Sequence, residues 1–128
     1  MPIEENKAIV RRYIEEVLNR GHLEVVDELF TPNMHPQVKQ IAAIFRTGFP
    51  DMHETIEDLI AEGDTVAARW TFRGTHQGEF DDLPASGKSV TMTGMSFYHL
   101  GGGKILDDWA EWDELGLLEQ LGAHPQAE

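Results

Sequence analysis

Hydrophobic residues recur every three to four positions through the first fifty residues, which is the period of helices that bury one side. Residues 4–20 follow this pattern and precede Gly21, a residue type that commonly ends a helix. The pattern predicts a shorter second helix over 23–30, stopped by Thr31-Pro32-Asn33, and a third over 36–47 that ends at Gly48. We therefore expect three N-terminal helices.

From Val66 onward the hydrophobic positions alternate with polar ones, which is typical of a half-buried strand. One face of this strand carries Val66, Ala68, Trp70 and Phe72. Residues 53–61 are its predicted partner, because Glu62-Gly63-Asp64 between them suits a tight turn.

Two further strands are predicted over 88–100 and 104–112, separated by three glycines. The polar stretch 74–87 is expected to be a loop, residues 113–122 a last helix, and residues 123–128 a flexible tail. The order of elements predicts an α+β fold in which N-terminal helices pack on a curved, four-stranded antiparallel meander.

The register of the last two strands decides which face meets the helices. If the glycine turn centres on Gly102, Phe97 lies opposite Asp107 and Met95 opposite Trp109. One face then collects the apolar residues Ile105, Trp109, Met95, Phe97, Val66, Ala68, Trp70 and Phe72. The same face receives the polar residues Thr91, Thr93, His99, Asp107, Glu111 and Asp113. This mixture predicts a ligand pocket, and a single β-bulge would turn the later residues to the other face.

Composition and charge exclude several classes of function. A chain of 128 residues with 41% hydrophobic residues predicts one globular domain, 1–128, with its core over 6–122. The net charge of −13 disfavours nucleic acid and anionic membranes as partners. The absence of cysteine and of an N-terminal export pattern leads us to expect a cytoplasmic location. The six histidines show no metal-binding spacing, so we expect neither a metal nor a cofactor.

Several short stretches, taken together, carry a family resemblance. They are Phe49-Pro50-Asp51, residues 63–70, Gly74-Thr75-His76-Gln77-Gly78, Gly103-Lys104-Ile105, Trp109, Asp113 and Gln120-Leu121-Gly122. In this order and spacing the chain resembles the SnoaL-like polyketide cyclase (ester cyclase-like) family of the nuclear transport factor 2-like superfamily. The resemblance implies a cone-shaped α+β barrel with a strongly curved sheet, a deep apolar pocket for a small hydrophobic or polycyclic molecule, and a homodimer formed through the sheet's outer face.

The resemblance also implies candidate catalytic residues. In the cyclases an aspartate near the end of the last strand is the general acid/base for an intramolecular aldol closure without a metal or cofactor, and that position matches Asp113. The family's second polar position matches His99. Asp113 is also well placed to cap the last helix, and His99 lies about eight residues along the hairpin from it, roughly 26 Å at about 3.3 Å per residue. Asp107-Asp108 and Glu111 read by default as a solvated edge.

The expected pocket walls are aromatic. The candidate substrate-binding residues are Tyr13, Trp70, Phe72, Met95, Phe97 and Trp109. Tyr13 either presents its hydroxyl to the pocket or caps the core. Relatives carry a longer segment where residues 33–37 pass almost directly into the third helix, so the pocket is expected to be open there. Two hypotheses remain: a cyclase, isomerase or hydrolase-like enzyme, and a non-catalytic homodimeric binding module.

Overall fold

The computed structural model describes residues 2–123, so the predicted tail from residue 124 onward lies outside the described residues. The helical elements are α1 (Ile3–Arg12), the π-helix η1 (Tyr13–Asn19), the 3-10 turns η2 (Leu23–Val25) and η3 (Pro32–Met34), α2 (Val26–Leu29), α3 (His35–Gly48) and α4 (Glu114–Gln120). The strands are β1 (His53–Glu62), β2 (Thr65–Thr75), β3 (Ser89–Gly101) and β4 (Lys104–Trp112). The predicted α+β fold is confirmed.

The first predicted helix is continuous but changes its winding at Tyr13. In the π-helix η1 the backbone N–H of Arg20 bonds to the carbonyl of Glu15, five residues back, at 3.1 Å. The carbonyls of Leu18 and Asn19 at its end accept hydrogen bonds from the Arg46 guanidinium at 2.7 and 3.0 Å. Single-turn π segments are rare in proteins, but where they occur they often lie at functional sites. This one begins at Tyr13 and ends at Asn19, and both contribute to the site described below.

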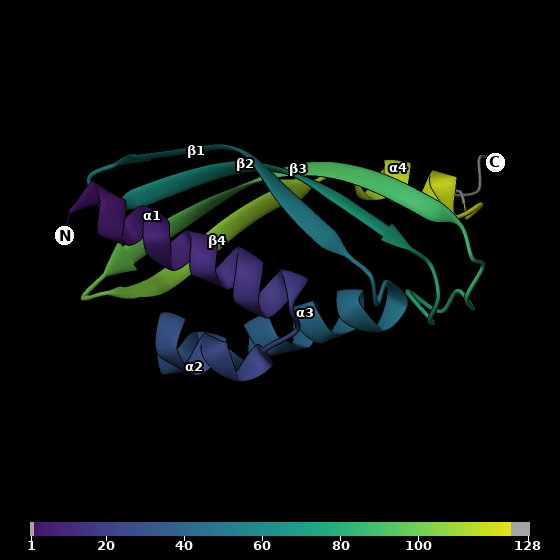
Figure 1. The fold of residues 1–128 in the computed structure, drawn as a ribbon, viewed down its shortest axis with the longest axis horizontal. Coiled ribbons are helices and arrows are strands. Elements are labelled where there is room, and N and C mark those ends of the chain that lie inside the picture. The colour runs from purple at the N-terminus through teal and green to yellow at the C-terminus, as the bar shows by residue number, and fades with distance from the viewer. Residues whose placement is uncertain (1, 124–128) are drawn as a thin grey trace.

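The four strands form one antiparallel sheet in chain order, as the predicted meander requires. Figure 1 shows α1, α2 and α3 on one side of the curved sheet, and α4 at the end near the C-terminus. The sheet stays open, with β1 and β4 as its edges, so the implied cone is not a closed barrel.

The register of the last two strands differs from the predicted one. Phe97 pairs with Trp109 and His99 with Asp107, whereas the next pair is Leu100 with Ile105. Leu106 is therefore an extra residue in β4, a β-bulge that reverses the alternation of the residues after it. Ile105 points into the core as predicted, but beyond the bulge the inward positions are Asp108, Ala110 and Trp112.

The predicted inner-face positions of Met95, Phe97 and Trp109 are therefore wrong. Their side chains lie on the outer face and are 55%, 54% and 72% exposed. Trp70 of β2 pairs with Gly94, and Phe72 with Met92, so the even-numbered residues of β3 share the inner face. Both faces of β3 carry large apolar residues, and alternation alone could not choose between them.

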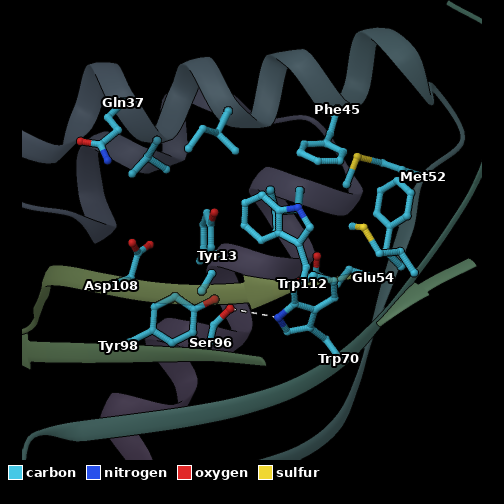
Figure 2. A pocket seen from close by; sticks show the side chains of 16 residues that line it. Tyr13, Gln37, Phe45, Met52, Glu54, Trp70, Ser96, Tyr98, Asp108 and Trp112 are labelled. Atoms are coloured by element: carbon cyan, nitrogen blue, oxygen red, sulfur yellow. Dashed lines mark hydrogen bonds between the residues drawn. The ribbon is translucent and has the colours of Figure 1, made fainter. Parts of the chain in front are cut away.

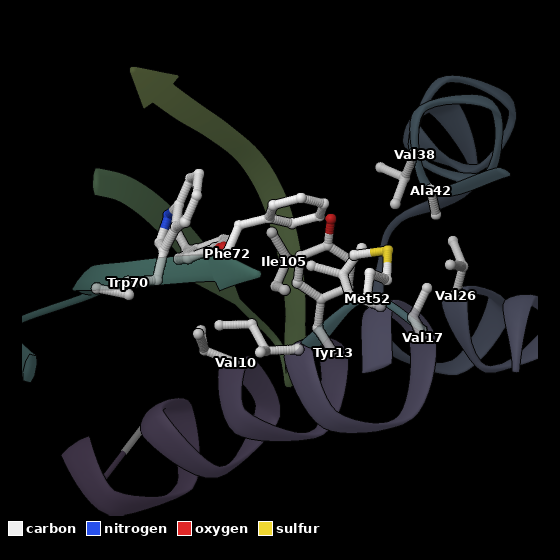
Figure 3. Packing of buried hydrophobic residues seen from close by; sticks show 14 of the residues in the cluster. Val10, Tyr13, Val17, Val26, Val38, Ala42, Met52, Trp70, Phe72 and Ile105 are labelled. Carbon is white, nitrogen blue, oxygen red and sulfur yellow. The ribbon is translucent and has the colours of Figure 1, made fainter. Parts of the chain in front are cut away.

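The core lies between the helices and the concave face of the sheet (Figure 3). Its buried members include Val10, Val17, Val26, Val38, Ala42, Phe72 and Ile105. The loop after β2 closes one end of this core, since Phe80 packs against Phe45 and Phe49 with ring centroids 5.1 and 5.2 Å apart. His76 anchors the loop, because its Nδ1 lies 2.9 Å from Ser86 Oγ.

The connection from α2 to α3 is as short as the sequence suggested. Phe30 forms a parallel bridge with Ile105, and the Thr31 N–H donates to the Ile105 carbonyl at 3.1 Å. η3 then leads directly into α3. No further strand covers the rest of β4 in residues 2–123, which leaves its outer edge open beside α3.

Two further features were sought in the described part of the chain. None of its helices is both long and apolar enough to cross a membrane. Across residues 2–123, no three His, Cys, Asp or Glu side chains gather closely enough to hold a metal ion.

Candidate functional site

A cavity of about 240 Å³ lies between α3 and the inner face of the sheet (Figure 2). Its apolar wall consists of Leu18, Val38, Ile41, Phe45, Met52, Trp70, Phe72, Met92, Ala110 and Trp112. Its polar groups are Tyr13, Gln37, Glu54, Ser96, Tyr98 and Asp108. The exposed lining residues Gln37, Ile41 and Ala110 form its mouth, on the side where the wall segment is short. A mostly apolar concavity with a few convergent polar groups is the usual form of a small-molecule site.

Glu54 is the most deeply buried acid of the cavity, with 7% of its surface exposed. Desolvation by burial raises the pKa of its carboxyl to about 8, because no cation compensates the charge. Asn19 fixes its backbone: the Asn19 side chain donates to the Glu54 carbonyl at 3.1 Å and accepts from the Glu54 N–H at 2.7 Å. The end of the π-helix thus positions a carboxyl that is mostly protonated at neutral pH.

Asp108 supplies the second carboxyl, from β4. It is partly buried, and burial, followed by the nearby Asp107 carboxylate, raises its pKa above the ordinary range of an aspartate. Asp108 faces the cavity because the bulge at Leu106 reverses the strand's alternation. Figure 2 shows it beside Tyr98 and below Gln37, at the end of the cavity away from Met52.

Two tyrosines lie between these acids. The rings of Tyr13 and Tyr98 pack edge to face, with centroids 6.0 Å apart. Burial raises the pKa of both hydroxyls well above the usual range, and both Glu54 and Asp108 raise it further. The phenols therefore stay protonated, and each can donate a hydrogen bond to an oxygen of a bound molecule.

The aromatic wall is held in place by specific contacts. The Trp70 indole N–H donates to Ser96 Oγ at 2.9 Å, and the Trp112 indole N–H donates to Glu114 Oε1 at 2.8 Å. Gly94 leaves room for Trp70, because a Cβ there would overlap the indole ring. The cavity therefore has walls that cannot move without breaking contacts.

The structure separates the predicted site residues into two groups. Tyr13, Trp70 and Phe72 line the cavity, and their binding role stays a prediction. Asp113 does not line it: its side chain is exposed and caps α4, accepting from the Gly116 N–H at 2.9 Å. The predicted pocket position of Asp113 is therefore wrong, because a helix begins directly after it and takes up its carboxylate.

His99 also lies away from the cavity. It is exposed on the outer face, with Nδ1 3.8 Å from Asp107 Oδ2. Its predicted position on the inner face of the sheet is wrong, because the real register turns its side chain outward.

Sequence reasoning missed Glu54, Tyr98, Trp112 and the inward position of Asp108. One local signal was available for Glu54, which alternates with the apolar Met52 and Ile56 and so has the parity of a buried side chain. A charged residue at such a position is a candidate for function.

Helices on a curved antiparallel sheet around an acid-bearing apolar cavity define the cone-shaped α+β fold of the nuclear transport factor 2-like superfamily. Within it, the chain belongs to the SnoaL-like polyketide cyclase family, which it matches over residues 8–121. The predicted family is thereby confirmed.

Solved structures share this fold. The crystal structure of AclR, a putative hydroxylase from Streptomyces galilaeus, is similar with a TM-score of 0.88 and 24% identity over 99% of this chain and 87% of that chain. A putative SnoaL-like polyketide cyclase from Jannaschia sp. CCS1 is similar with a TM-score of 0.87 and 23% identity, over 96% of this chain and 95% of that chain. IdmH, a putative polyketide cyclase from Streptomyces antibioticus, is similar with a TM-score of 0.76 and 28% identity, over 92% of this chain and 99% of that chain. A comparison with curated proteins found no match.

Proposed function

We propose that this protein is a cofactor-independent enzyme of the cyclase or isomerase type that performs general acid/base chemistry on a small apolar carbonyl compound. The observation that carries the proposal is the pair of carboxyls, Glu54 and Asp108, in one apolar cavity, each with a raised pKa. Pairs of carboxyls in unlike surroundings commonly divide the roles of acid and base. Membership of the cyclase family supports the same class of reaction.

Asp108 is the proposed base. Because it is only partly buried, it retains a carboxylate form that can take a proton from the carbon next to a carbonyl. Glu54, protonated up to a pH of about 8, donates to the carbonyl oxygen and stabilises the enolate. In an aldol closure the enolate carbon then forms the new C–C bond, and a proton returns to the new alkoxide. The reaction is redox-neutral, and every atom of the substrate is kept.

Exchange of α-protons for deuterium in a model ketone tests this chemistry. In D₂O, monitored by NMR, the protein is expected to accelerate exchange of the methyl protons of 2-acetylnaphthalene. Asp108→Asn is expected to lose about 100-fold or more of the acceleration. Glu111→Gln, which alters an exposed carboxyl on the outer face of the same strand, is the matched control and keeps most of it. Equal rates for Asp108→Asn and the unaltered protein would overturn the assignment.

The alternative function is a non-catalytic binding module with the same cavity. The exposed mouth at Gln37, Ile41 and Ala110 favours it, since an open site excludes water less completely. A protein that binds 2-acetylnaphthalene without accelerating its exchange would support this alternative. The expected cytoplasmic location is compatible with both and stays a prediction.

For the assembly we propose a homodimer through the outer face of the sheet. That face exposes Ile60, Met95, Phe97 and Trp109, of which Ile60 is 66% exposed. Arg69 and Asp58 form an ion pair of 2.7 Å beside them. A two-fold interface places one surface patch against the same patch of a second copy, so the patch must be complementary to itself. An apolar centre flanked by one positive and one negative side chain meets this requirement. Sedimentation should give a dimer that Phe97→Glu converts to a folded monomer; a monomeric unaltered protein would contradict this.

A further inference from the structure

Among residues 2–123, the ionisable groups that line the cavity are two carboxyls and two phenols, without a basic side chain. Glu54 and Asp108 both line it, and no Lys, Arg or His is among its lining residues in the range 2–123. The chain as a whole carries a net charge of −13. A carboxylate, phosphate or sulfate inside would face Asp108 without a cation to pair with, in surroundings of low dielectric. The cavity is thus built for an uncharged molecule.

The size of the cavity gives a second limit. A cavity of about 150 Å³ in a protein core accommodates benzene, whereas this one measures about 240 Å³. The difference allows a second ring but not four. The walls do not yield easily, because Phe45 packs edge to face on both Phe72 and Trp112, with centroids 5.6 and 6.2 Å apart.

The two ends of the cavity differ in character. Figure 2 shows Phe45 and Met52 at one end, and Gln37, Asp108 and Tyr98 at the other. A ring system fits the first end by apolar contact, and a carbonyl fits between the two acids, where the phenol hydroxyls of Tyr13 and Tyr98 can also donate to it.

We propose that the cavity selects uncharged carbonyl compounds of one or two rings, and rejects both anions of the same shape and frameworks of four fused rings. On this proposal, the polycyclic ligand implied by the family resemblance does not fit within the cavity of this chain. The identity of the ligand as a carbonyl substrate rests on the proposed function, whereas the selection by charge and size rests on the cavity's lining and volume alone.

Three probes test this selection at pH 7.5 by titration calorimetry with the full chain. They are 2-acetylnaphthalene, its anionic near-isostere 2-naphthoate, and progesterone, an uncharged ketone of four rings. We expect saturable binding of 2-acetylnaphthalene, and binding of the other two at least about tenfold weaker. Binding of 2-naphthoate or progesterone as tight as that of 2-acetylnaphthalene would overturn the proposal, as would no binding of 2-acetylnaphthalene.

Two variants locate the effect. Asp108→Asn is expected to narrow the difference in affinity between 2-acetylnaphthalene and 2-naphthoate severalfold, whereas Glu111→Gln, at an exposed carboxyl on the outer face, leaves this difference unchanged. Ala110→Phe at the exposed mouth should weaken the binding of 2-acetylnaphthalene about tenfold or more. An unchanged affinity would show that this probe binds outside the cavity and would overturn the proposal. If selective binding is found without α-proton exchange, the proposed chemistry fails while the selection stands.

Discussion

The side chain of Asn19 pairs with both backbone polar groups of Glu54, at 3.1 Å to the carbonyl and 2.7 Å from the N–H. An amide side chain thereby replaces a neighbouring strand at the free edge of β1. This pair joins the end of the π-helix to the acid that lies deepest in the cavity.

Replacing Asn19 should therefore both destabilise the fold and loosen the site. Asn19→Ala leaves two backbone groups without partners, at an expected cost of roughly 1–3 kcal/mol in the free energy of unfolding. Asn19→Asp keeps the acceptor but not the donor, and should cost less. Urea denaturation measures both. A cost for Asn19→Ala no larger than that of Glu15→Ala, one turn away on an exposed position, would contradict the pairing.

The stability of the protein should fall with rising pH because of Glu54. Its folded pKa, about 8, exceeds that of an unfolded glutamate, so above a pH of about 4.5 the native state holds a proton that the unfolded state has lost. Stability declines as pH rises from about 4.5 to about 8 and is unaffected by Glu54 outside this window. The total effect is on the order of a few kcal/mol.

Glu54→Gln removes this titration. Relative to the unaltered protein, the variant should gain stability progressively between pH 5 and 8, as measured by urea midpoints at each pH. A difference that stays constant across this range would show that Glu54 titrates normally in the folded protein.

Gly94 should not tolerate a side chain. Besides meeting the Trp70 ring, a Cβ there would lie 2.8 Å from the Glu111 carbonyl. Gly94→Ala is expected to cost about 1–3 kcal/mol, displace Trp70 and change the tryptophan fluorescence. Gly101→Ala is the matched control, because its Cβ would meet only the mobile end of Leu106 at 2.9 Å. Equal costs for the two substitutions would refute the close approach of Trp70.

Asp113 should affect stability but not chemistry. Asp113→Ala removes the cap of α4 and should cost about 1 kcal/mol, whereas Asp113→Asn keeps a good capping side chain and costs less. Both should exchange the α-protons of 2-acetylnaphthalene at the unaltered rate. Loss of exchange in Asp113→Asn, with stability unchanged, would restore this aspartate as the base.

The order of helices and strands could be predicted because each segment shows one clear period. Val66, Ala68, Trp70 and Phe72 alternate cleanly, and their face was assigned correctly. β3 lacks this clarity, since Phe97 and Tyr98 are adjacent and both aromatic. Which of the two faces inward is decided by the register between β2 and β3. The sequence does not give this register, because the loop that joins the two strands is too long to fix it.

The candidate site was harder to predict than the fold. Its acids are brought inward by features that hydrophobic periodicity does not report: a bulge at Leu106 for Asp108, and burial against the helices for Glu54. The capping role of Asp113 was foreseeable from its place before a helical segment. Family resemblance favoured the catalytic role, and local hydrogen bonding favoured the cap.

The bulge at Leu106 also links two surfaces that would otherwise change independently. If Leu106 entered the ladder opposite His99 in place of Asp107, the rest of the strand would exchange its faces, bringing Asp107 and Trp109 into the cavity and turning Asp108 and Trp112 outward. Deletion of Leu106, in contrast, would close the bulge and leave both faces as they are. The pairing of one residue thereby sets both the side chains offered to a ligand and those offered to a second subunit. In the divergence of related chains, shifts of register in this strand should consequently have larger effects on ligand choice than most substitutions within it.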